Sequence, residues 1–153
     1  MGTFTTKLRI WNPAMPGQVE ELEVWVDTGA RYSWISRDRL EKLGIRPGRK
    51  VQFQTIEGRV IEREMAPAFV STDGYVGGDT VVMAEPGDME VMGAYTLESL
   101  GLTVDVVHQK LVPVVVHLAL AATGSTVKVR RSRIVMAIDD DIEDGRLGEP
   151  FSE

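Results

Sequence analysis

Residues 24–35 constrain the fold of this chain more than any other stretch. Two apolar segments rich in β-branched and aromatic residues flank the turn sequence Asp27-Thr28-Gly29-Ala30. The flanks predict buried strands, and the turn residues predict a sharp junction between them. This turn would hold the Asp27 carboxylate at the edge of an apolar framework. Because Asp and Gly also dominate ordinary turns, the tetrapeptide alone leaves a plain hairpin turn open as the alternative.

The rest of the chain is interpreted mostly as short strands separated by turns. Strands are predicted at residues 3–11, 19–26, 32–35, 51–56, 59–66, 67–72, 75–84, 89–92, 104–107 and 111–120, with partial alternation at 126–138. Helices are predicted at 37–43 and 94–100, stopped by Gly44 and Gly101. Ser36 is predicted to cap the first helix. The pattern predicts a mainly β protein.

Length and composition indicate one globular domain without a bound metal or cofactor. The 153 residues are predicted to form a single domain at 1–138, followed by an acidic tail at 139–153. The net charge of −6 gives no support for a nucleic-acid partner. The absence of cysteine excludes disulfides, thiolate catalysis and cysteine metal sites. His108 and His117 are too far apart for a paired-histidine metal motif.

The sequence offers no membrane or export signal. The first residues lack the basic-then-apolar pattern of a signal peptide. The most apolar run, residues 111–122, is too short to span a bilayer and is interrupted by His117. We therefore expect a cytoplasmic protein without a membrane partner.

Three segments together resemble the retropepsin-like aspartic proteases, a family of single-lobe enzymes, and especially its small bacterial and archaeal members. The first segment is 26–30, with Ser33 following. The second is 91–94, two apolar residues and a glycine that lead into a helix. The third runs from 97 to 105 and continues through 110–113. The resemblance covers roughly residues 3–116.

This resemblance implies an acid-protease half-barrel that works as a homodimer. Asp27 of each subunit would meet its twin across a two-fold axis, and the two carboxylates would share one proton. One carboxylate would act as general base on a water molecule while the protonated one polarises the scissile carbonyl. Catalytic roles follow for Asp27, Thr28, which would lock the two turns together, and Gly29, which would let the substrate backbone approach.

The resemblance also implies a flap at residues 54–60 and a set of substrate-binding residues. These are Ala30, Arg31, Ile56, Glu57 and Gly58, with Gly58 near the flap tip. Arg31 occupies the position where retroviral members carry an acidic residue that holds the substrate main chain. The predicted function is an aspartic endopeptidase acting on peptides or unfolded protein segments. A non-catalytic dimeric peptide-binding module of the same fold is the main alternative, and a monomeric β-rich ligand-binding domain is a more distant one.

Overall fold

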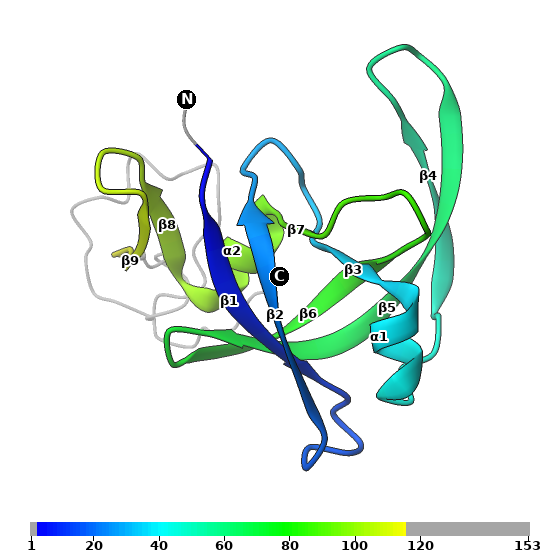
Figure 1. Ribbon diagram of the computed structural model, residues 1–153, viewed down its shortest axis with the longest axis horizontal. Helices are drawn as coiled ribbons and strands as arrows, with labels where there is room; N and C mark the ends of the chain where they lie inside the picture. The colour runs from blue at the N-terminus through cyan, green and yellow to red at the C-terminus, as the bar shows by residue number, and fades with distance from the viewer. Residues whose placement is uncertain (1–2, 116–153) are drawn as a thin grey trace, which may run out of the picture. The chain divides into compact units, whose positions relative to one another are not determined.

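The computed structural model describes residues 3–115 of the chain (Figure 1). The residues up to Val114 form one compact unit. This part contains nine strands and two short helices, in the order β1 (Thr5–Trp11), β2 (Val19–Val26), β3 (Trp34–Ser36), α1 (Arg37–Lys42), β4 (Arg49–Gln54), β5 (Val60–Thr72), β6 (Tyr75–Ala84), β7 (Val91–Met92), α2 (Ala94–Leu100), β8 (Leu102–Asp105) and β9 (Lys110–Pro113). The predicted mainly β class with two short helices is confirmed. The predicted strand at 126–138, the domain end at 138 and the acidic tail lie outside the described residues.

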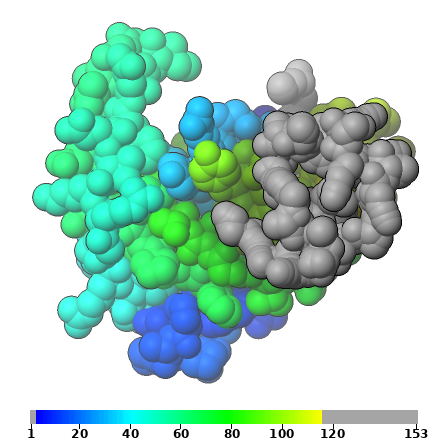
Figure 2. Space-filling model, turned by 180° about the vertical axis from the view of Figure 1, so that it is seen from behind, coloured from blue at the N-terminus to red at the C-terminus, as the bar shows by residue number. Residues whose placement is uncertain are grey.

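Seven of these strands form one sheet that closes on itself. Their order is β1-β2-β7-β3-β6-β5-β4, and β1 also pairs with β5. The β1–β5 pairing joins every strand of this sheet except β4 into a ring around the core. β4 pairs with the first half of β5, and the resulting hairpin extends away from the ring (Figures 1 and 2). β8 and β9 form a separate two-stranded sheet.

Alternation along β1 and β2 decides which face of the ring is buried. Their inward side chains are Leu8, Ile10, Leu22, Val24 and Val26. Each such side chain contributes about 1.5–3 kcal/mol when fully buried. The outward face of β2 carries Trp25, and one further step of the alternation gives Asp27. The hydrophobic pattern therefore directs the predicted catalytic side chain away from the core.

Both helices begin at the predicted residues; α2 also ends as predicted, and α1 ends one residue earlier, at Lys42. Gly44 and Gly101 follow α1 and α2 with φ of 74° and 72°, the left-handed conformation that glycine adopts most readily. Ser36 occupies the N-cap position of α1 as predicted, but the prediction that its side chain caps the helix is wrong, because it makes no capping bond. Ser36 is still part of β3, and its N–H donates to Oε2 of Glu90 at 2.8 Å.

The predicted strand break at Pro67 is also wrong. β5 runs without interruption from Val60 to Thr72. On one edge, β5 pairs with β4 up to Met65 and with β1 from Phe69 onward. Pro67 lies where this edge changes partner, and there the missing N–H of proline interrupts no ladder. Most other strand ends differ from the predictions by a few residues; β8, for example, begins at Leu102 rather than at residue 104.

Candidate active site

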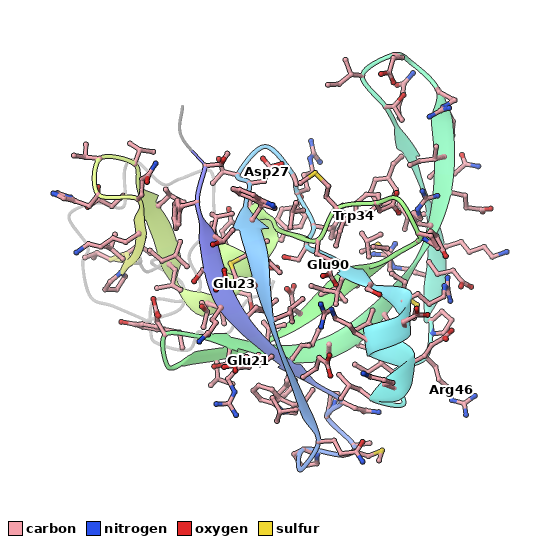
Figure 3. The ribbon with its side chains drawn as sticks, in the orientation of Figure 1. Glu21, Glu23, Asp27, Trp34, Arg46 and Glu90 are labelled. Atoms are coloured by element: carbon pink, nitrogen blue, oxygen red, sulfur yellow. The ribbon has the colours of Figure 1, made fainter. Side chains whose placement is uncertain are left out.

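Asp27 directly follows β2 and begins the turn that the sequence predicts (Figure 3). Its N–H donates to the carbonyl oxygen of Met92 in β7 at 2.9 Å. Its Oδ1 accepts the N–H of Gly29 at 2.9 Å, and its carbonyl oxygen accepts the N–H of Ala30 at 3.1 Å. Asp27, Thr28 and Gly29 are all exposed. A single chain thus holds the carboxylate firmly and leaves it open to solvent.

The first turn of α2 holds the loop that follows Asp27. The N–H of Ala94 donates to the carbonyl oxygen of Ala30 at 2.8 Å, and the N–H of Tyr95 donates to that of Arg31 at 2.9 Å. These bonds join segments that lie far apart in the sequence. The loop conformation therefore depends on α2 as well as on its own residues.

Gly93 allows this close approach of two backbones. A Cβ atom at this position would lie 2.5 Å from the carbonyl oxygen of Tyr32 and 2.8 Å from that of Ala30. Real Cβ atoms essentially never come this close to another heavy atom. The glycine of the 91–94 segment is therefore a steric requirement of the site.

A buried chain of hydrogen bonds runs beneath the loop. The N–H of Gly93 donates to Oγ of Ser33 at 2.9 Å, and the Ser33 hydroxyl is bonded to that of Thr96. Thr96 donates to Oδ2 of Asp79 at 2.5 Å, and Oδ1 of Asp79 accepts the N–H of Thr80 at 2.9 Å. Burial raises the pKa of the Asp79 carboxyl group, and these two hydrogen bonds partly oppose the rise. These hydrogen bonds link β6, α2 and the loop that follows Asp27.

A row of large apolar side chains crosses the sheet beside Asp27. Trp25 lies opposite Val91, and Val91 lies opposite Trp34. Residues opposite each other on neighbouring strands share a face, and Trp25 shares its face with Asp27 two positions later. Trp25 remains 43% exposed. The part of this face next to Asp27 is thus apolar, whereas Glu21 and Glu23 lie further back along β2 on the same face.

Aromatic rings connect this face to the projecting hairpin. Phe53 of β4 contacts Trp34 and Tyr32, with ring centroids 5.1 and 6.3 Å away. Tyr32 also meets Tyr95 edge-on at 5.2 Å. Phe53 pairs with Ile61, one pair before the ladder ends near the tip, so this part of the hairpin packs against the loop that follows Asp27.

Ion pairs fix the same hairpin closer to its base. Arg63 of β5 makes two bonds to the Asp88 carboxylate, at 2.8 and 3.0 Å. Arg37 of α1 contacts Glu64 at 2.7 Å and Glu85 at 2.8 Å. The Arg63 guanidinium lowers the pKa of Asp88. The hairpin is thus anchored at residues 63 and 64, and its outer part extends beyond these anchors.

The sequence model of the aspartyl protease family matches residues 13–95, which is more than half of the chain and includes the Asp27 turn, the hairpin and Gly93. The chain belongs to the aspartyl protease family. It is therefore a hydrolase of the aspartic peptidase class, and the family predicted from the sequence is confirmed.

Solved protease structures are similar to this aspartyl protease. The solution structure of the simian foamy virus (mac) protease is 17% identical, with 62% of this chain and 92% of that chain covered and a TM-score of 0.45. The EIAV protease in complex with the inhibitor HBY-793 is 24% identical, with 65% and 89% covered and a TM-score of 0.48. No curated protein matches the sequence.

The predicted substrate-binding residues of the protease fall into two groups. Ala30 and Arg31 lie in the loop after Asp27, whereas Ile56, Glu57 and Gly58 lie at the tip of the hairpin, where Gly58 has φ of 91°. Within residues 3–115, no hydrogen bond or ion pair joins the tip to the loop. The structure therefore brings the first group next to the predicted catalytic residues and leaves the second group apart from them.

Several residues of the site were not predicted from the sequence. For Asp79 the sequence holds one usable signal, because aspartate is depleted in strands and this one lies in the middle of a predicted strand. Trp34 and Phe53 could not be predicted as site residues from any local pattern, because only the strand register brings them together.

Residues 3–115 include no group of three or more His, Cys, Asp or Glu side chains placed to hold a metal ion. Neither helix in this range is long and apolar enough to cross a membrane.

Proposed function

We propose that the protease is an endopeptidase that works as a homodimer, with Asp27 from each subunit in a shared active site. The observation that carries this proposal is the single exposed Asp27 on a rigidly held turn. The sequence contains one Asp-Thr-Gly segment. A pair of such carboxylates therefore requires two chains, related by a two-fold axis through their turns.

The chemistry follows from placing two carboxyl groups a few ångströms apart. Their mutual repulsion favours a state in which the pair holds one proton. The ionised Asp27 takes a proton from a bound water as its oxygen attacks the scissile carbonyl carbon. The protonated Asp27 donates a hydrogen bond to the carbonyl oxygen, where negative charge develops. Proton transfer to the amide nitrogen then lets the C–N bond break and returns the pair to its starting state.

The surroundings of Asp27 support binding of an extended peptide. Trp25 and Trp34 offer apolar surface on the same face, and Arg31 adds a positive charge to the adjoining loop. At the hairpin tip, Ile56 is completely exposed at 102% of its reference area. An isoleucine in this position has apolar surface to bury against a substrate, and closure of the hairpin would also exclude water.

The test is cleavage of an unstructured polypeptide, followed by mass spectrometry of the fragments. Asp27→Asn should abolish turnover while the protein stays folded, because the amide cannot act as a base. Asp73→Asn is the matched control, since Asp73 is an exposed aspartate on the turn between β5 and β6. Sedimentation at micromolar concentration should show a dimer. Cleavage by Asp27→Asn at the wild-type rate would refute the mechanism, and absence of turnover in the wild type would favour the peptide-binding module.

A further inference from the structure

Asp79 is a partly buried carboxylate that the proposed chemistry does not use. It lies on β6, outside the Asp27 turn and the hairpin. Its two oxygens each accept one hydrogen bond, Oδ2 from the Thr96 hydroxyl and Oδ1 from the Thr80 N–H. Burial of a carboxylate is unfavourable unless its oxygens are hydrogen-bonded. The presence of this carboxylate in the middle of β6 therefore needs an explanation in terms of structure or function.

The direction of the hydrogen bonds around Asp79 can be assigned. A threonine hydroxyl has one hydrogen, and Thr96 donates it to Asp79. The Thr96 oxygen must then accept from the Ser33 hydroxyl, and the Ser33 oxygen accepts the Gly93 N–H. Every hydroxyl in this relay accepts one bond and donates one. Such a relay, which we define as Gly93–Ser33–Thr96–Asp79, requires a pure acceptor at its end, and a carboxylate provides it.

The far end of the relay reaches the backbone that holds Asp27. Gly93 directly follows Met92, whose carbonyl oxygen accepts the Asp27 N–H. Ser33 belongs to the loop that begins at Asp27, and its side chain is completely buried. The relay thus connects β6 to both segments that define where the Asp27 carboxylate lies.

We propose that Asp79 is a positioning residue of the protease, whose carboxylate terminates the relay and thereby holds the Asp27 loop in its catalytic geometry. The inference rests on the proposed function of Asp27. Misplacement of a reacting group by about 1 Å can reduce a rate about 100-fold without loss of the fold. Asp79 acts through Ser33 and Gly93, and it touches neither substrate nor water in the reaction.

Two substitutions break the relay at different places. Asp79→Asn leaves one acceptor oxygen where two donors require acceptors, so either the Thr96 or the Thr80 bond is lost. Thr96→Val keeps the side-chain shape and removes the hydroxyl, whereas Thr96→Ser keeps the hydroxyl. Asp73→Asn again serves as the exposed control.

The experiment measures kcat and KM for an unstructured peptide, corrected for the folded fraction of each variant from circular dichroism. Asp79→Asn and Thr96→Val should each lower kcat about 10- to 100-fold, with KM within about twofold of the wild type. Thr96→Ser should restore most of kcat. The double variant should be no worse than either single variant, because both changes break one relay. Equal kcat per folded molecule in Asp79→Asn, Thr96→Val and wild type would overturn the inference, as would equal losses in Thr96→Val and Thr96→Ser.

A second readout does not depend on catalysis. Amide hydrogen exchange at Asp27, Ala30 and Ala94 should become faster in Thr96→Val and remain slow in Thr96→Ser. Unchanged exchange in both variants would overturn the inference even if the wild type showed no protease activity. Full activity of Asp27→Asn would instead refute the proposed function. The two failures are therefore distinguishable, and the Thr96 pair keeps the test valid should Asp79→Asn fail to fold.

Discussion

Replacement of Gly93 by alanine tests most directly how the loop that follows Asp27 packs against the start of α2. The added Cβ would lie 2.5 and 2.7 Å from the carbonyl oxygen and carbon of Tyr32 and 2.8 Å from the carbonyl oxygen of Ala30. All three are backbone atoms, so no side chain can rotate to make room. Gly93 has φ of −97° and ψ of −179°, an extended conformation that alanine adopts freely. In the folded state, the substitution therefore acts through steric overlap and not through backbone strain at residue 93 itself.

The magnitude follows from opposing contributions. Loss of glycine's freedom in the unfolded chain favours alanine by about 0.4–1 kcal/mol. Overpacking typically costs about 1–3 kcal/mol. If the backbones separate, the bond from Ala94 N–H to the Ala30 carbonyl at 2.8 Å is lost as well, at about 0.5–1.5 kcal/mol. We expect a net destabilisation of about 1–3 kcal/mol.

Urea unfolding followed by circular dichroism, at one fixed protein concentration, measures this change. Gly17→Ala is the matched control, because a Cβ at Gly17 meets nothing within 4 Å and no positive φ is required there. The control should be neutral or slightly stabilising, whereas Gly93→Ala should unfold at clearly lower urea and lose peptidase activity. Equal midpoints for the two variants would show that the loop and α2 do not pack as described.

Four further predictions concern the hairpin and the charges. Ile56→Ser should change the free energy of unfolding by less than about 0.5 kcal/mol, because this side chain is fully exposed. It should nevertheless lower kcat/KM about 10-fold or more. An unchanged kcat/KM would exclude substrate contact by the hairpin tip. Phe53→Ala should destabilise the protein by about 1–3 kcal/mol through its two ring contacts, and a thermal melt identical to wild type would contradict this. The pKa of Asp88 is lowered by its hydrogen bonds from Arg63. The pair therefore stabilises the fold above the unfolded pKa of about 3.9 and ceases to do so as the pH falls through the lower folded pKa. The free energies of unfolding of wild type and Arg63→Gln, measured by urea titration, should therefore differ near neutral pH and converge in strong acid. In the proposed homodimer, only the singly protonated pair of Asp27 carboxylates would be active. Peptidase activity should therefore fall on both sides of an optimum pH, and a rate that never falls at high pH would rule out that pair.

The sequence was sufficient wherever one local pattern decided the structure. The limits of β2, β6 and α2 agree with the prediction, because alternation, a turn or a left-handed glycine marks each end. The sequence was insufficient where a partner residue far away in the chain determined the local structure. Pro67 stays inside β5 because β4 pairs with this edge up to Met65 and β1 pairs with it from Phe69 onward. The Ser36 N–H donates to Glu90, which lies 54 residues further along the chain.

The site divides in the same way. Asp27 and its turn could be predicted from contiguous residues, whereas the need for glycine at position 93 arises from its contact with the distant backbone of Ala30 and Tyr32. The apolar row from Trp25 to Trp34 depends on register across β7, which no local pattern encodes. The role of Asp79 depends on α2 crossing β6 at Thr96. Contacts of this kind are set by the tertiary fold.

The parallel pairing of β2 with β7 also determines when the protease acquires its site. Trp25 and Val91 lie far apart along the chain, so this pairing closes a long loop, which makes it slower to form than local hairpins such as β1–β2. During synthesis, a growing chain that ends before β7 contains the Asp27 segment but lacks the Met92 carbonyl that holds it. The bonds from Ala94 and Tyr95 to the loop after Asp27 are missing from such a chain as well. The turn that carries Asp27 can therefore be completed only after β7 and the start of α2 have been synthesised.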